Sequence, residues 1–287
     1  MAKNYNGYEI FKGRTLVVAT MHKKEKFIAP ILEKELGVYC QTVPNLNTDD
    51  FGTFTGEVER KDTPMATVKA KAMAALDKTE ETLVVASEGS FGPHPSFFFI
   101  SANEEMVILI DTKNNIEIRG WHLTSETNFN NQEIKNMNDL REFENLIGYP
   151  EHGIILKTTD GEQKKKIWKD SQSSEALRSK VHDLLKKNIS ITAETDMRAM
   201  NNPTRMKAIE LAIIDLVQNV KSLCPECNAP GFAISEVIRG LRCSLCNRPT
   251  KSAEAYVYAC QKCDYSCEKA KENVTQEDPM YCDFCNP

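Results

Sequence analysis

Four Cys-x-x-Cys pairs near the end of the chain constrain its fold more than any other feature of the sequence. Two cysteines separated by two residues can place both sulfurs on one metal ion, and two such pairs complete a tetrahedral zinc site. The first two pairs are 15 residues apart and the last two are 18 apart, and both gaps fit zinc-ribbon spacing. The sequence therefore predicts a double zinc ribbon with two structural Zn2+ ions, bound by Cys224, Cys227, Cys243, Cys246, Cys260, Cys263, Cys282 and Cys285.

The spacing leaves the pairing of these motifs open. Sequential pairing, first with second and third with fourth, is the expected arrangement, and a cross-brace that joins the first pair to the third is the alternative. An iron–sulfur cluster is the less favoured metal centre. Two cysteines remain: Cys267 could replace a zinc ligand, and Cys40 is most simply a buried thiol.

The charge of the cysteine-rich tail bears on its partners. Residues 221–287 carry 8 lysines and arginines against 9 aspartates and glutamates, and eight thiolates with two zinc ions lower the net charge to about −5. Affinity for nucleic acid depends mainly on cations that meet phosphates. We therefore expect the tail to pack against the rest of the chain or to bind a protein partner, and nucleic acid is not the expected partner.

Composition sets the broad class of the protein. The chain has 287 residues, of which 41% are hydrophobic and 27% charged, and a net charge of −5. No apolar run approaches the roughly 18 residues that span a membrane, and Met1 to Arg14 lacks the apolar region of a signal peptide. We therefore expect a cytoplasmic protein with no membrane partner, whose cysteines do not form disulfides.

Hydrophobic periodicity predicts an α/β domain with a mixed sheet and flanking helices over residues 1–220, followed by the ribbon over 221–287. Strands are expected at residues 15–20, 83–86, 106–110, 116–119 and 153–156. Helices are expected from Phe27 to Leu36, from Thr63–Pro64 onward, over residues 175–187, and from Asn202–Pro203 onward, where threonine or asparagine caps the helix and proline starts it.

The stretch after the strand at 83–86 is the main candidate for a ligand site. The apolar run ends at Ser87-Glu88, and two glycines, two prolines and His94 follow within a few residues. In open α/β sheets ligands bind outside the carboxyl ends of the strands. We therefore expect a loop that presents Glu88 to a ligand, and a plain turn with one solvated acid is the alternative.

The start of the last long helix is a second candidate. Arg205 and Lys207 lie in its first turn, and Arg198 precedes it. Cations at a helix N-terminus oppose the helix dipole, whereas an anion there is stabilised by the free N–H groups. These residues are therefore expected to bind a negative ligand, and surface cations paired with nearby acids are the alternative.

Three motifs together resemble the inosine/xanthosine triphosphate pyrophosphatase family, which removes non-standard purine nucleotides. They are Leu16–Thr20 with the following polar turn and helix, Glu59 with Thr63–Ala72 and Ala86–Gly89, and Asn202–Ala208. Their order along the chain is that of the family. The matches depart from the family at Glu25, Thr67, Ser87 and Thr204, which replace its lysine, asparagine, first aspartate and histidine.

This resemblance implies specific roles. Glu88 and Glu59 would hold a catalytic Mg2+, and His94 could transfer protons. The ligand's phosphates would be bound by Thr20, Lys24, Lys71, Ser87, Arg198, Arg205 and Lys207. Over its full length the chain is more similar to an uncharacterised bacterial family that joins the Ala86–Pro95 stretch to Asn202–Met206 and a cysteine tail ending in Cys285-Asn-Pro287.

Three functions follow from these observations. The first is a metal-dependent hydrolase of nucleotides, because breaking a phosphoanhydride needs cations on the phosphates and a divalent ion. The second is a non-catalytic protein that senses a nucleotide and binds a partner through its zinc ribbon. The third is a nucleic-acid-processing protein.

Overall fold

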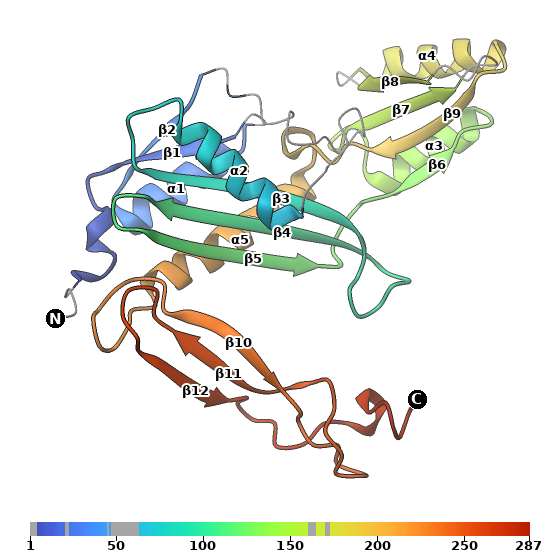
Figure 1. Ribbon diagram of the computed structural model, residues 1–287. Coiled ribbons are helices and arrows are strands. Elements are labelled where there is room, and N and C mark those ends of the chain that lie inside the picture. Colours follow the sequence, from blue (N-terminus) through green and yellow to red (C-terminus); the bar gives the residue numbers. More distant parts are fainter. Residues whose placement is uncertain (1–4, 21–22, 45, 47–62, 160–164, 170–172) are drawn as a thin grey trace.

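The computed structural model describes residues 5–20, 23–44, 46, 63–159, 165–169 and 173–287. Its main sheet has five strands in the order β2-β1-β3-β4-β5 (Figure 1). β1 (Thr15–Ala19) is parallel to both β2 (Tyr39–Thr42) and β3 (Leu83–Pro93). β4 (Ser101–Asp111) and β5 (Ile116–Thr124) continue the sheet in antiparallel fashion. The prediction of a mixed α/β sheet is confirmed.

Helices cover both faces of this sheet (Figure 1). α1 (Glu25–Leu36) and α5 (Pro203–Lys221) pack on one face against Leu83 and Val85, and α2 (Pro64–Leu76) packs on the other against Val84 and Ala86. Successive side chains of a strand point to opposite faces. The uninterrupted apolar run of β3 therefore supplies two separate cores.

The helix boundaries follow from the capping residues. Thr63 Oγ1 accepts a hydrogen bond from Ala66 N at 3.3 Å, and Asn202 Oδ1 accepts one from Arg205 N at 2.9 Å. A proline begins each of these two helices. Gly37 ends α1 in the left-handed conformation that glycine adopts without strain. These predicted helix ends are confirmed.

The expected loop at Ser87–Ser90 was wrong. β3 runs on to Pro93 and pairs with β4 along its whole length, and Ser87, Glu88 and Gly89 lie opposite Val107, Met106 and Glu105. The end of the apolar run does not end the strand, because antiparallel pairing satisfies the backbone whatever the side chains are. Glu88 is therefore held on a strand rather than on a turn.

The described residues between 131 and 195 form an inserted lobe with a sheet of its own (Figure 1). Its four strands are antiparallel in the order β6-β9-β7-β8. The elements are β6 (Asn131–Glu133), α3 (Met137–Ile147), β7 (Ile154–Thr159), β8 (Lys165–Lys169), α4 (Ser174–Lys186) and β9 (Ser190–Thr195). The sequence predicted a strand and a helix in this stretch but not a separate sheet.

The cysteine-rich tail forms a three-stranded antiparallel sheet in the order β10-β11-β12. β10 spans Ala233–Arg239, β11 spans Ala253–Ala259 and β12 spans Ser266–Ala270. Short 3-10 helices lie at Gly7–Phe11 (η1), at Ala199–Asn201 (η3) and at Pro279–Tyr281 (η4). Among the described residues, no helix is long and apolar enough to cross a membrane.

Candidate functional site

The eight cysteines of the four pairs gather into two groups at opposite ends of the tail sheet. The inner tetrad contains Cys224, Cys227, Cys260 and Cys263, and the outer tetrad contains Cys243, Cys246, Cys282 and Cys285. The first pair thus joins the third and the second joins the fourth, so the expected sequential pairing was wrong and the cross-brace is correct. One strand of the tail sheet separates each pair from the next pair in the sequence. Successive pairs therefore lie at opposite ends of the sheet and cannot bind the same ion.

The distances between sulfurs fit zinc. Sγ–Sγ distances across the pairs are 3.7 and 3.6 Å in the inner tetrad and 3.9 and 3.6 Å in the outer one. Four sulfurs at about 2.3 Å from a tetrahedral zinc ion lie about 3.8 Å apart, far beyond a disulfide bond. The tetrads are therefore compatible with two structural zinc sites. Cys267 and Cys40 belong to neither group.

The inner tetrad also attaches the tail to the main sheet. The side chain of Gln261, between two of its cysteines, accepts a hydrogen bond from Glu117 N at 3.0 Å and donates one to Glu117 O at 2.5 Å. Lys262 Nζ donates to Asn114 O at 2.8 Å, and Tyr5 N donates to Cys227 O at 2.9 Å. The predicted packing of the tail against the rest of the chain therefore has a specific contact surface on the outer edge of β5.

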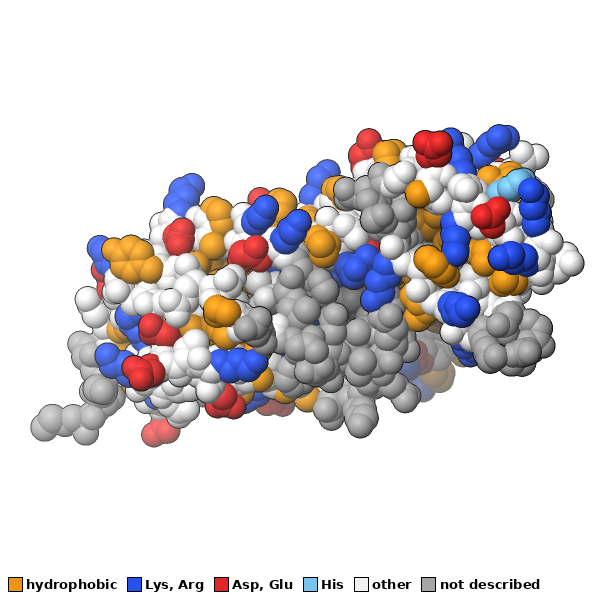
Figure 2. All heavy atoms as spheres, turned by 90° about the horizontal axis from the view of Figure 1, so that it is seen from above, with side chains coloured by type: hydrophobic (Ala, Val, Ile, Leu, Met, Phe, Trp, Pro, Cys, Tyr) orange, Lys and Arg blue, Asp and Glu red, His pale blue; other side chains and the backbone are white. Residues whose placement is uncertain are grey.

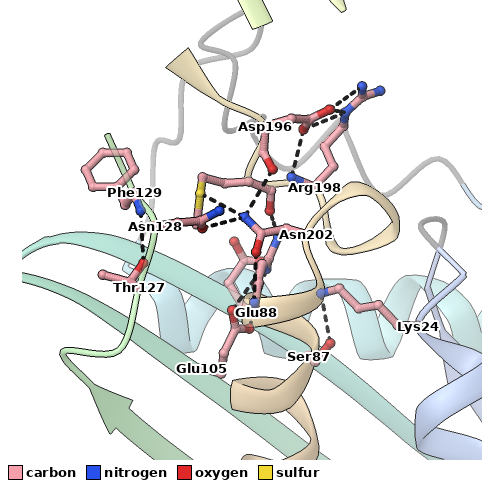
Figure 3. Close-up of polar contacts among 12 residues, drawn as sticks. Lys24, Ser87, Glu88, Glu105, Thr127, Asn128, Phe129, Asp196, Arg198 and Asn202 are labelled. Atoms are coloured by element: carbon pink, nitrogen blue, oxygen red, sulfur yellow. Dashed lines mark hydrogen bonds and ion pairs between the residues drawn. The ribbon is translucent and has the colours of Figure 1, made fainter. Parts of the chain in front are cut away.

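A second candidate site is a cluster of buried charges at the carboxyl end of β1. It contains Lys24, Lys71, Glu88, Glu105 and Arg205, which are each 8% exposed or less. We call this group the charged cluster. Figure 3 shows Lys24, Ser87, Glu88 and Glu105 close together below Asn202. Buried charges are rare without partners, so the contacts of each member decide what the cluster can do.

Glu88 and Lys71 form an ion pair on the α2 face of the sheet. Lys71 Nζ donates to Glu88 Oε2 at 2.5 Å, and the Glu88 side chain is 3% exposed. α2 brings Lys71 there because it buries its residues at 67, 68, 71, 72 and 75. The two residues that the sequence proposed for metal and for phosphate therefore neutralise each other.

Arg205 and Glu105 form a second pair on the opposite face. Arg205 Nε donates to Glu105 Oε1 at 2.7 Å, and both side chains are fully buried. Gly89 lies opposite Glu105 in the sheet, and a Cβ atom on it would lie 2.5 Å from an Arg205 nitrogen. Gly89 is therefore needed for close approach and not for a turn. The sequence predicted that Arg205 binds a negative ligand. In the structure its anionic partner is Glu105, a carboxylate of the chain itself.

Lys24 connects the two pairs. It directly precedes α1, and its Nζ donates to Ser87 Oγ at 3.0 Å. Burial lowers the pKa of Lys24 to about 7; the positive charges of Arg205 and Lys71 lower it too, whereas Glu105 and Glu88 act in the opposite direction. All four charges therefore act on one amine, although they reach it from both faces of the sheet. The structure brings Lys24 near Lys71, Glu88 and Arg205. Arg205, however, lies on the opposite face of the sheet from Lys71 and Glu88. The phosphate-binding and metal-binding roles implied for these residues stay predictions.

The other predicted site residues are not members of the charged cluster. His94 belongs to the turn after β3, roughly 16 Å or more beyond Glu88 along the strand, and its Nδ1 accepts hydrogen bonds from Ser96 N and Phe97 N. Arg198 is paired with the buried Asp196 at 2.6 Å (Figure 3), and Lys207 is exposed. Thr20 follows β1 and donates its N–H to Val18 O. Glu59 lies outside the described residues.

Glu105 is the cluster member that sequence reasoning missed. It lies in β4 two residues before the buried Val107 and four before Leu109, so it occupies a core position of that strand. The alternation of inward-facing and outward-facing residues along β4 could have identified Glu105 as a buried acid. A carboxylate at a core position needs a buried cation as its partner. Its partner is 100 residues further along the chain, and no local pattern identifies it.

The chain belongs to the family described as "Domain of unknown function (DUF6671)", whose sequence profile matches residues 71–287. No curated protein matches the chain. Four chains of solved structures match, including "Crystal structure of protein VC0702 from Vibrio cholerae", with 9% identity and a TM-score of 0.31. That match covers 72% of this chain and 94% of the other. A TM-score this low supports no conclusion about the fold.

Proposed function

We propose that the charged cluster binds the phosphate groups of a nucleotide and that the chain hydrolyses a phosphoanhydride bond of this ligand with a divalent metal ion. The observation that carries the proposal is the excess of buried basic groups over carboxylates. Among the described members of the cluster, three basic side chains face two carboxylates, and Lys24 has the neutral hydroxyl of Ser87 as its hydrogen-bond acceptor. A bound phosphate would hold Lys24 in its charged form and supply the counter-ion for it.

The position of Lys24 supports the same proposal. It lies between the carboxyl end of β1 and the first turn of α1, the usual place for a phosphate in an α/β sheet. A lysine with a lowered pKa is also typical of functional sites. The resemblance of the three sequence motifs to nucleotide pyrophosphatases supports a nucleotide as the ligand, and hydrolysis as the reaction.

The metal ion is a further part of the proposal. Mg2+ prefers carboxylate oxygens, and Glu88 offers one in the cluster. When bound, the ion would stabilise the charge that develops on the phosphates. The chain's own contribution is to hold the phosphates with Lys24 and to orient Glu88 through Lys71 at 2.5 Å. The proposal also includes the fold: the main sheet would be of the nucleotide pyrophosphatase type that the resemblance of the three motifs implies.

A non-catalytic nucleotide sensor is the second candidate. The Lys71–Glu88 pair favours it, because the charge of Glu88 is already compensated without a metal ion. Nucleic-acid processing has less support. On the face shown in Figure 2, lysine and arginine side chains lie among acidic and hydrophobic ones rather than in a continuous basic surface, and nucleic-acid binding depends on clustered cations.

One experiment tests the proposal. The pure protein is incubated with Mg2+ and a panel of nucleoside triphosphates, pyrophosphate and phosphate release are measured, and binding is measured by calorimetry. We expect turnover and an at least tenfold weaker affinity in Lys24→Met, in line with the roughly 1.5–3 kcal/mol of a charge-assisted hydrogen bond. Lys69→Met is the matched control, because Lys69 lies on α2 but pairs with Glu117 outside the cluster. Binding without turnover supports the sensor, and no binding refutes both.

A further inference from the structure

Asn103 on β4 carries a buried polar atom without a partner. The side chain is 1% exposed, and within the part of the chain that the structure describes its Oδ1 is the only buried side-chain oxygen or nitrogen with no hydrogen bond. Buried amide oxygens in folded proteins are almost always paired. An exception at this depth leaves an acceptor for a donor from outside the chain, either a ligand group or a buried water molecule.

The position of Asn103 points to the same ligand as the charged cluster. Asn103 is opposite Phe91 of β3 in the sheet, and strand alternation places it on the face of Glu105, two residues away. The ring of Phe91 lies 5.7 Å from that of Phe129 and 5.1 Å from the Arg205 guanidinium. The unpaired oxygen thus belongs to the cross-strand neighbour of Phe91, and the rings of Phe91 and Phe129 are both partly exposed.

The spacing along β3 fits the two ends of a nucleotide. Ser87, which holds Lys24, and Phe91, which faces Asn103, are four residues apart. At about 3.3 Å per residue this is roughly 13 Å, a distance that a nucleoside triphosphate spans between its phosphates and its base. Phosphates at Lys24 and a base at Asn103 are therefore compatible with one bound molecule.

We propose that Asn103 determines specificity for a base-bearing ligand: its Oδ1 accepts a hydrogen bond from an N–H group of the base, whose ring lies against Phe91 and Phe129. The inference rests on the proposed function, since it places the base of the nucleotide whose phosphates the charged cluster binds. It assigns the ligand class as a nucleoside phosphate rather than an inorganic polyphosphate. A site that holds a polar group ready for one substrate atom strongly disfavours ligands that lack this atom.

The test compares two ligands on one variant. Asn103→Leu keeps nearly the same volume and removes the unpaired oxygen, and Asn145→Leu on the exposed side of α3 is the matched control. Calorimetry measures the affinity for nucleoside triphosphates and for inorganic tripolyphosphate. We expect at least a tenfold loss for the nucleotides in Asn103→Leu, with tripolyphosphate within twofold of wild type. The melting temperature without ligand should stay the same or rise, because a buried unpaired group disappears.

The possible results separate this inference from the proposed function. Equal losses for both ligands, or no loss for the nucleotides, overturn the role of Asn103 and leave phosphate binding standing. A drop of several degrees in the melting temperature of Asn103→Leu without ligand overturns the inference too, since it would show that Asn103 has a structural partner such as a buried water. A wild-type protein that binds neither ligand overturns both proposals.

Discussion

The charged cluster of the main sheet and the cysteine tetrads of the tail bury ionisable groups in different ways. In the cluster, Glu88 and Glu105 receive their counter-ions from Lys71 and Arg205 of the same chain. In each tetrad, four sulfurs converge on one point, and repulsion between thiolates there must be offset by a cation that the chain does not supply. The difference predicts that the main sheet folds without a metal ion, whereas the tail depends on one.

Metal removal should therefore have the largest effect of all. We expect two zinc ions per chain by elemental analysis, and we expect strong chelators to unfold residues 222–287 while the main sheet keeps its structure. Structural zinc contributes roughly 10–16 kcal/mol to the folding of small zinc domains, far more than any single contact in the cluster. Limited proteolysis reports the result. A chelated tail as resistant as the zinc-loaded one would contradict the comparison.

The two tetrads themselves sharpen this prediction. Cys224→Ser should loosen the inner end and release the contacts of Gln261 with Glu117 of β5 and of Lys262 with the β4–β5 turn. Cys243→Ser affects the outer end, where Leu245 and Phe284 are largely exposed. Hydrogen exchange at Glu117 should accelerate in the first variant and stay unchanged in the second. Equal effects of the two variants on Glu117 would show that the tail is docked by some other surface.

The second-largest effect is expected at Arg205. Arg205→Ala leaves Glu105 buried without its cation, and breaking a buried pair in this way costs about 3–5 kcal/mol. Urea denaturation should show this loss of unfolding free energy, and Arg205→Lys should recover only part of it, because lysine cannot reproduce the fixed fork of a guanidinium. The double variant Arg205→Met/Glu105→Leu should regain most of the stability.

An unchanged unfolding free energy in Arg205→Ala would break the comparison. It would mean that Arg205 binds an external anion, as the helix dipole suggested, and that Glu105 is stable in the core without Arg205. The sequence favoured that external anion because a cation in the first turn of a helix is locally unfavourable. The pairing across 100 residues, from β4 to α5, outweighs the local effect.

These two regions show how far sequence reasoning reaches. Cysteine spacing identified all eight candidate ligands, because the geometry of a Cys-x-x-Cys pair is local. It did not identify the cross-brace, which depends on where β10, β11 and β12 carry each pair. Likewise the capping residues Thr63 and Asn202 predicted where α2 and α5 begin. The packing of Gly89 against Arg205 could not be predicted without knowing the register between β3 and β4. Local chemistry was predictable, and the pairing of distant segments was not.

Lys24 provides the smallest and most specific prediction. Its pKa in the folded protein is about 7, below the value of 10.5 for a free lysine. Between these two values the unfolded chain binds more protons than the folded one, so the unfolding free energy should rise with pH, by roughly 1 kcal/mol from pH 7 to pH 8. Below pH 7 both states carry the proton and the contribution levels off. The difference between wild type and Lys24→Met in urea denaturation isolates this slope, with Lys69→Met as the control.

Ligand binding should reverse the proton balance at the same amine. A phosphate beside Lys24 favours its charged form, so binding above pH 7 must take up a proton, and the affinity for tripolyphosphate should fall as the pH rises from 7 to 9. Calorimetry in two buffers of different ionisation enthalpy measures this uptake directly. Proton uptake that persists in Lys24→Met would assign the titrating group to another residue or to the phosphates of the ligand. If the proton uptake disappears in Lys24→Met, Lys24 is the titrating group. The main sheet would then contain a buried amine whose positive charge is balanced by a ligand, whereas the thiolates of the tail are balanced by a metal ion.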